Sequence, residues 1–179
     1  MVQLLEFGNT TLLKILSFFL RNPTKKISYT NLRKTLKIAK ASLTKYLKLL
    51  LREELIKVEM IGLNKIYELD KGNLIVKQLK ILDNLLILSD IKPVCDKHEI
   101  EIYLYGSAAR GEDTEGSDID LLMIGKISKE QVSSDVANIS KKIGREIKFS
   151  IFSPLEWSKM SRRDIAFYER IEKDRIRLC

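Results

Sequence analysis

Two aspartates and a glycine-serine turn lie within one stretch of the chain, Leu104–Ile124, and their types and spacing suit phosphate chemistry. Gly106 lets the backbone approach a phosphate closely, and Ser107 adds a hydroxyl beside backbone N–H groups. Asp118 and Asp120 are two apart in an apolar run that predicts a strand, so both side chains leave one face. Because two carboxylates on one face repel each other, they favour a divalent ion between them. The stretch predicts a phosphate site beside a metal site.

Positive charge is concentrated in the first part of the chain. The 179 residues include 32 basic and 24 acidic side chains, which gives a net charge of +8. Residues 1–70 hold 13 basic and 6 acidic side chains, whereas residues 71–179 hold 19 and 18. An excess confined to one part is typical of a module that binds a polyanion. The alternative is a set of ordinary solvated helix faces in a lysine-rich protein.

Cysteine and histidine usage and hydropathy exclude several classes of site. Cys95 and Cys179 are too few and too far apart in the chain to indicate a disulfide framework or a zinc site. A single histidine, His98, excludes a histidine-based metal site. No apolar run reaches the roughly 18 residues that span a membrane, and Met1–Asn9 lacks the pattern of a signal peptide. We therefore expect a cytoplasmic protein without a membrane partner.

Apolar periodicity predicts three helices and a hairpin in the first 70 residues. The helices are expected at Thr10–Leu20, Ser28–Leu36 and Lys40–Arg52, and the third has a clean apolar stripe. Two alternating runs, Leu55–Met60 and Lys65–Leu69, flank a turn with Gly and Asn and predict a hairpin.

This order of elements resembles the winged-helix variety of helix-turn-helix domain. In that fold the third helix enters the major groove of DNA and the hairpin contacts the backbone. The resemblance implies that these residues of the third helix face DNA: Lys40, Ser42, Thr44, Lys45 and Lys48. It also implies that Lys57 or Lys65 contacts DNA from the hairpin. A winged helix that contacts protein is the alternative.

A longer helix is predicted at Leu74–Ser89, with a wide apolar stripe that must be covered. A second copy of the chain is one way to cover it, so this helix is a candidate for the seam of a homodimer. Pro93 is expected to break the helical pattern ahead of a strand at Ile100–Tyr105. A polar break at Asp70–Asn73 separates the modules. The predicted division is residues 1–70, a connecting helix at 71–98, and a second domain at 99–179.

The full pattern is Gly106-Ser107-Ala108-Ala109-Arg110-Gly111 and then Ser117-Asp118-Ile119-Asp120-Leu121. It resembles the signature of the DNA polymerase β nucleotidyltransferase superfamily, G-S-x-A-R-G followed by S-D-h-D-h, where h is apolar. Every specified position is present, and the resemblance covers roughly Ile100–Ile151 and extends loosely to the C-terminus. The shortness of the domain points to the minimal nucleotidyltransferases. The resemblance implies an α+β chain, with an N-terminal winged helix-turn-helix followed by a small nucleotidyltransferase α/β domain with a mixed sheet.

The resemblance also implies a site. Asp118 and Asp120 would bind Mg²⁺ or Mn²⁺ and act in catalysis. The superfamily has a third carboxylate on the next strand, where Glu146 is the one acid in a strand expected at Arg145–Phe152; an exposed glutamate at a strand end is the alternative. A nucleoside triphosphate, with ATP as the expected donor, would contact Gly106, Ser107, Arg110 and Ser117. The acids between the motif halves are interpreted as solvated loop charges: Glu112, Asp113 and Glu115.

Three functions remain open. The first is a metal-dependent transferase that adds a nucleoside monophosphate to a protein or other hydroxyl acceptor. With its winged helix it would be an antitoxin-type regulator, and a cognate toxin is one candidate acceptor. The second is a DNA-binding transcriptional regulator whose nucleotidyltransferase-like domain senses nucleotide or has lost catalysis. The third, a template-directed or RNA-tailing polymerase, is disfavoured because we expect the chain after the third strand to be too short for a substrate-holding domain.

Overall fold

The computed structural model describes residues 9–179 of the chain. Its contacts divide the chain between Lys80 and Ile81, within the helix α4 (Leu74–Ile87), into two compact units. Among the described residues, no helix is both long enough and apolar enough to cross a membrane. The expectation that Met1–Asn9 is not a signal peptide lies outside the described residues, except for Asn9.

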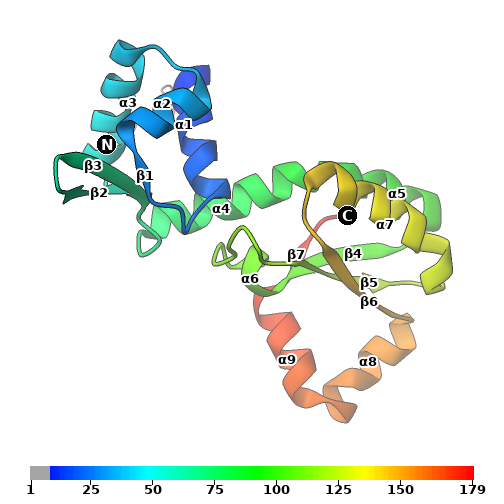
Figure 1. The fold of residues 1–179 in the computed structure, drawn as a ribbon. Coiled ribbons are helices and arrows are strands. Elements are labelled where there is room, and N and C mark those ends of the chain that lie inside the picture. The colour runs from blue at the N-terminus through cyan, green and yellow to red at the C-terminus, as the bar shows by residue number, and fades with distance from the viewer. Residues whose placement is uncertain (1–8) are drawn as a thin grey trace. The chain divides into compact units, whose positions relative to one another are not determined.

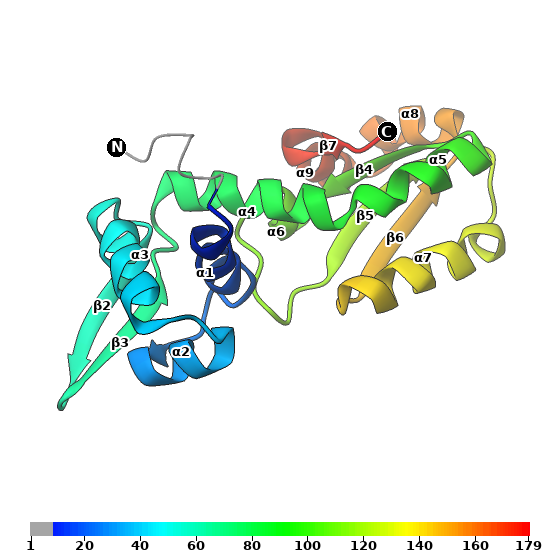
Figure 2. The same ribbon diagram turned by 90° about the horizontal axis from the view of Figure 1, so that it is seen from above.

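Helices and a small antiparallel sheet make up the described part of the first unit (Figure 1). Its elements before α4 are α1 (Thr10–Arg21), β1 (Ile27–Ser28), α2 (Tyr29–Leu36), α3 (Lys40–Arg52), β2 (Ile56–Ile61) and β3 (Asn64–Leu69). The strand order is β1-β3-β2, with β3 antiparallel to both neighbours. Figure 2 shows the β2–β3 hairpin beside α3. The predicted helices and hairpin are confirmed with small shifts at their ends, and β1 is an addition.

Side chains that accept hydrogen bonds from free N–H groups begin the first two helices. Asn9 Oδ1 accepts hydrogen bonds from the N–H groups of Thr11 and Leu12, at 3.0 and 3.1 Å. Ser28 Oγ accepts one from the N–H of Asn31 at 3.3 Å. Both are favoured N-cap residues because the first N–H groups of a helix have no partner within it. The beginnings of α1 and α2 therefore follow from local sequence.

A mixed sheet with helices on both faces makes up residues 81–179, all of which the structure describes (Figures 1 and 2). Its strand order is β6-β5-β4-β7; β5 is parallel to β6, and β4 is antiparallel to both β5 and β7. The mixed α+β class is as predicted. The elements after α4 are η2 (Ser89–Ile91), α5 (Lys92–His98), β4 (Glu101–Tyr105), α6 (Gly106–Ala109), β5 (Ile119–Ile124), α7 (Lys129–Ile143), β6 (Ile147–Phe152), α8 (Pro154–Arg163), α9 (Ile165–Asp174) and β7 (Ile176–Arg177).

Alternation along β5 divides the apolar side chains of this unit between two cores. Leu121 packs in the core shared with α5 and α7, whereas Leu122 packs with Trp157 in the core shared with α8 and α9. Figure 1 shows these helix pairs on opposite sides of the sheet. Because side chains alternate between faces, Asp118 and Asp120 share the face of Leu122. Both aspartates therefore belong to the α8–α9 side of the sheet.

Two predictions near Pro93 are corrected by the structure. Pro93 lies in the first turn of a further helix, α5, which begins at Lys92, and the first turn of a helix needs no N–H from proline. The sulfurs of Cys95 and Cys179 form a disulfide, with their Cα atoms 6.4 Å apart. The sequence separation of 84 residues concealed this pairing. The C-terminal residues return to α5 because β7 pairs with β4, which is a non-local contact.

Candidate functional site

The carboxylates of Asp118 and Asp120 lie at the start of β5. Asp120 is opposite Tyr105 of β4 and Lys148 of β6 in the sheet register. Burial, and then the negative charge of Asp118, raise the pKa of Asp120, while nearby positive charges, including that of Arg170 on α9, offset part of this effect. The two aspartates therefore act on each other electrostatically, as their spacing predicts.

The glycine turn lies directly against this pair. Gly106 follows β4 with a φ of 75°, in the left-handed region that favours glycine. A Cβ at this position would lie 2.6 Å from Oδ2 of Asp120, closer than real Cβ atoms approach. Glycine is therefore required both by the backbone conformation and by the adjacent carboxylate. Ser107 is the next residue, in the single short turn of α6.

Lys148 of β6 lies beside the carboxylates. Its Nζ forms an ion pair with Oδ2 of Asp118. A hydrogen bond to Asp118, together with the negative charge of that residue, raises the pKa of Lys148. The Lys148 side chain is 58% exposed and the Asp118 side chain 32%, so solvent reaches this ion pair. A lysine that was not predicted for the site thus supplies a cation to one of its two aspartates.

The predicted third carboxylate does not join the pair. Glu146 precedes β6 and is exposed, and its backbone carbonyl accepts a hydrogen bond from the N–H of Ile119 at 2.8 Å. Among residues 9–179, no group of three or more Asp, Glu, His or Cys side chains could hold a metal ion. The predicted metal set of Asp118, Asp120 and Glu146 is therefore not brought together. On this face of β6 it is Lys148 that reaches Asp118.

Two predicted nucleotide-binding residues hold the loop between the motif halves. Arg110 donates to Glu112 from Nε and to Asp174 of α9 from Nη1, both at 3.0 Å. Ser117 Oγ accepts a hydrogen bond from the N–H of Thr114 at 2.8 Å and lies 3.0 Å from the Thr114 hydroxyl. These contacts tie the loop to itself and to α9, so both residues have structural partners at the edge of the site.

A buried ionic cluster behind the loop was missed by the sequence analysis. Asp113, interpreted as a solvated loop charge, is 4% exposed. Its carboxylate accepts hydrogen bonds from Nη1 of Arg145 at 2.8 Å and Nδ2 of Asn84 at 3.1 Å. Arg145 also donates from Nε and Nη2 to the carbonyl of Ser117, at 3.1 and 2.9 Å. Because Ser117 precedes Asp118, this cluster fixes the backbone that leads into the carboxylate pair.

The lysines predicted to face DNA are exposed on the first unit. The helix α3 buries one face through Leu43, Leu47 and Leu50, which lie at helical spacing. The remaining surface of α3 and the hairpin present four exposed lysines of the predicted set: Lys40, Lys45, Lys48 and Lys65.

Other residues predicted for this surface have partners within the unit. Thr44 is partly buried, and its hydroxyl lies 3.0 Å from the hydroxyl of Tyr29. Ser42 is also partly buried. Lys57 forms an ion pair with Asp70 at 2.9 Å. The hairpin also exposes apolar side chains that the sequence analysis did not single out: Val58, Met60, Ile61 and Leu63.

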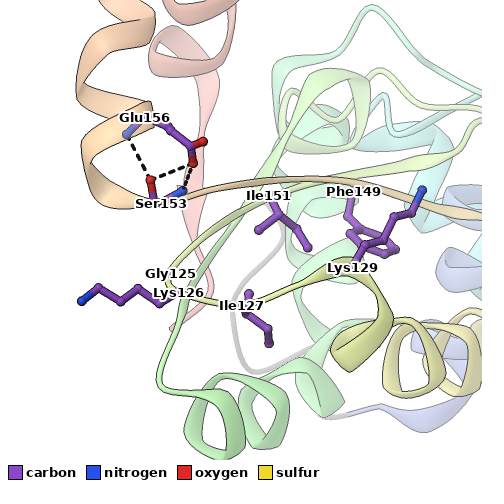
Figure 3. Close-up of a pocket in the computed structure, with 8 residues that line it drawn as sticks. All are labelled: Gly125, Lys126, Ile127, Lys129, Phe149, Ile151, Ser153 and Glu156. Carbon is purple, nitrogen blue, oxygen red and sulfur yellow. Dashed lines mark hydrogen bonds between the residues drawn. The ribbon is translucent and has the colours of Figure 1, made fainter.

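A pocket of about 390 Å³ lies on the other face of β6 (Figure 3). Phe149 and Ile151 line it, and Nζ of Lys129 lies 5.7 Å from the centroid of the Phe149 ring. Ser153 and Glu156, also in its lining, form the capping box of α8. Because Phe149 follows Lys148 along the strand, it points to the opposite face. The residues lining this pocket include none of the predicted site residues.

Comparison with known families finds a match in the C-terminal part of the chain. Residues 88–174 match the family model described as a nucleotidyltransferase domain. The matched range holds both motif halves and the strands that carry them, and it supports the nucleotidyltransferase superfamily for this part of the chain. Transfer of a nucleoside monophosphate is the general chemistry that such a domain suggests. A search of curated proteins finds no significant match.

Proposed function

We propose that the C-terminal unit transfers a nucleoside monophosphate from a nucleoside triphosphate, with ATP as the expected donor, to a hydroxyl on a protein or another acceptor. The observation that carries the proposal is the contact between the Gly106 turn and the Asp120 carboxylate. It puts a backbone that a phosphate can approach beside a pair of charged oxygen ligands. The family match over residues 88–174 supports the same chemistry.

One divalent ion would be held by the carboxylate pair. The pKa of Asp120 is raised by burial and by the charge of Asp118, so a cation near both oxygens relieves an existing repulsion. Asp118 and Asp120 would hold Mg²⁺ or Mn²⁺, which when bound supplies positive charge to phosphate oxygens and acidity to an acceptor hydroxyl. A third carboxylate from Glu146 is not part of this proposal.

The chain's own residues would act by binding and orientation. The backbone N–H groups of the Gly106 turn and the Ser107 hydroxyl would contact phosphate oxygens. Arg170 acts electrostatically on Asp120, and its guanidinium would add positive charge for a bound triphosphate. Arg145 would hold the Ser117 carbonyl and so keep the pair in place. Phosphoryl chemistry depends mainly on position and charge, which makes such a small set of groups sufficient.

We propose further that residues 1–70 are a winged helix-turn-helix that binds DNA through α3 and the hairpin, with 71–98 as a connecting segment and 99–179 as the transferase domain. The exposed lysines opposite the leucine face of α3 support this proposal. The chain would then be an antitoxin-type regulator whose acceptor is a cognate toxin or another protein. The exposed side chains of Ile75, Leu82 and Leu86 on α4 make that helix the candidate seam of a homodimer.

The ion pair between Lys148 and Asp118 favours a second function. A transcriptional regulator that senses nucleotide without transferring it needs a phosphate site but no complete set of metal ligands. Such a protein would bind ATP and change its affinity for DNA, and it would release no pyrophosphate.

Transfer is tested with ATP labelled at the α-phosphate. The full chain is incubated with this ATP and Mg²⁺, alone and with the protein encoded by a neighbouring gene. Label that becomes covalently attached to protein, with release of pyrophosphate, supports the transferase. Binding of ATP that alters DNA mobility, with neither attached label nor pyrophosphate, would instead establish the second function.

DNA binding is tested by a mobility shift with DNA from upstream of the chain's own gene. We expect affinity to fall steeply with salt, because lysine–phosphate contacts release counterions. The double substitution Lys45→Glu and Lys48→Glu should weaken binding by about tenfold or more, since two phosphate contacts become repulsive. Lys142→Glu, at an exposed site on α7, is the matched control. Unchanged binding by the α3 variant would exclude α3 as the DNA-contacting helix.

A further inference from the structure

We propose that Lys148 is a built-in counter-cation of the carboxylate pair, so that a divalent ion binds Asp118 and Asp120 only by displacing the Lys148 ammonium. The inference concerns the site of the proposed function and rests on that function only for the nucleotide that would accompany the ion. The competition itself is a property of the side chains around the pair.

The pairing of the strands fixes the backbone position of Lys148. Strands β5 and β6 pair in parallel from Ile119 and Ile147 onward, and this register sets Lys148 beside Asp120. The Lys148 side chain leaves the same face as the pair, and its Nζ reaches Asp118. Backbone pairing of β5 with β6 therefore fixes residue 148 beside the pair. From there its ammonium contacts Asp118 and its charge acts on Asp120.

The Lys148 ammonium and a divalent ion are both cations, so they compete for the Asp118 carboxylate. An ammonium on Asp118 occupies a carboxylate oxygen that a divalent ion would use, and two cations at one carboxylate repel each other. The ammonium brings one positive charge to a pair that carries two negative charges, whereas a divalent ion brings two. Exchange of one for the other is therefore favourable only when the ion is present in sufficient concentration.

Solvent and other anionic groups can receive the displaced Lys148 ammonium. The Lys148 side chain is more than half exposed, so its head group can move into solvent without leaving a cavity. Glu146 lies two residues earlier on the same face of the chain, and its charge already acts on Lys148. The acid predicted to bind metal would thus receive the released lysine. A phosphate oxygen of a bound triphosphate is the other available partner.

The test is a titration of the full chain with Mn²⁺ in the absence of nucleotide, in which the paramagnetic resonance signal reports free ion. Lys148→Met keeps the length of the side chain and removes its charge, so it should tighten Mn²⁺ binding by about tenfold. Lys148→Arg should bind Mn²⁺ as the wild type does. Lys142→Met, which breaks the exposed ion pair with Asp90 on the same unit, is the matched control and should change nothing.

Two further variants locate the effect. Adding Asp118→Asn to Lys148→Met should abolish the gain, because the freed carboxylate is then lost. Lys148→Asp should bind Mn²⁺ more tightly than Lys148→Met does, because a third carboxylate replaces the ammonium. Thermal unfolding of each variant verifies that it is folded.

Equal Mn²⁺ affinity in the wild type and Lys148→Met would overturn the inference, as would a gain that survives Asp118→Asn. The outcome is separable from that of the proposed function because no nucleotide is present. A shifted affinity without nucleotidyl transfer in any variant keeps the inference and removes the proposed function. Transfer by the wild type, with equal Mn²⁺ affinity in the wild type and Lys148→Met, removes the inference and keeps the proposed function.

Discussion

Asp113 and Asp120 lie in the same unit and carry the same side chain, yet their surroundings are opposite. Asp113 is almost fully buried, and both of its carboxylate oxygens accept hydrogen bonds, one from Asn84 and the other from Arg145. Asp120 is only partly buried, and burial and then the negative charge of Asp118 raise its pKa. The negative charge of Asp113 is balanced by partners within the protein. The negative charge of Asp120 is disfavoured by its surroundings.

This difference separates a structural carboxylate from a functional one. A buried ion that is paired and hydrogen-bonded holds its surroundings in one arrangement, and removing its partner is costly. Two like charges held close together, with a glycine turn against them, gain most from a ligand that arrives from outside. Burial alone would have marked Asp113 as the more unusual residue, so it is the partners that distinguish the two.

The largest expected effect is on stability, at the satisfied aspartate. Asp113→Asn leaves the guanidinium of Arg145 without its counter-charge, so we expect the free energy of unfolding to fall by about 3 kcal/mol. Urea unfolding followed by circular dichroism measures it. Asp90→Asn, at an exposed aspartate paired with Lys142, is the control and should change the free energy by less than about 0.5 kcal/mol. Equal effects at the two sites would show that the cluster does not stabilise the unit.

The second largest expected effect is on the rate of nucleotidyl transfer, when Gly106 beside Asp120 is substituted. In Gly106→Ala the new methyl group collides with Asp120 and displaces the turn or the carboxylate, so transfer should fall by about a hundredfold. Gly144→Ala is the matched control, because Gly144 also has a positive φ, of 70°, but a Cβ there meets nothing within 4 Å. Transfer by Gly106→Ala at the same rate as by Gly144→Ala would show that the close approach of the turn to Asp120 is not required.

The smallest effect has the opposite sign to the first. The raised pKa of Asp120 means that its ionised form disfavours folding above that pKa. Asp120→Asn should therefore raise the free energy of unfolding at pH 7, by less than about 1 kcal/mol at this partly exposed site. The gain should vanish as the pH falls below the usual aspartate range, where Asp120 is protonated in both states. Thermal unfolding at both pH values checks the sign, and a destabilised Asp120→Asn at pH 7 would remove the contrast with Asp113.

Sequence spacing was sufficient for features that depend on local geometry. Asp118 and Asp120 share a face because strands alternate, and apolar periodicity predicted α1 and α2 to within a residue at each end. The mixed sheet was implied by the resemblance to the nucleotidyltransferase superfamily. The prediction of a turn at Gly106 also depended only on the residues next to it in the sequence.

Pairings that cross the sheet were not available from spacing. The alternation in β6 already placed Lys148 on the same face as Glu146, but the register with β5 decides which of them reaches Asp118. A search for a third acid therefore selected Glu146. Asp113 was misread for a similar reason, because its partner Arg145 is 32 residues away in sequence. Arg145 lies in the short link between α7 and β6, and the local sequence there does not indicate which carboxylate it pairs with.

The central claim is that the carboxylate pair, held against the Gly106 turn, carries out nucleotidyl transfer. It is tested most directly by measuring label transferred from α-phosphate-labelled ATP by the wild type and by the double variant Asp118→Asn and Asp120→Asn. We predict transfer by the wild type and a loss of about a thousandfold or more in the variant, whose thermal unfolding should show an intact fold. Full transfer by the folded double variant would contradict the account.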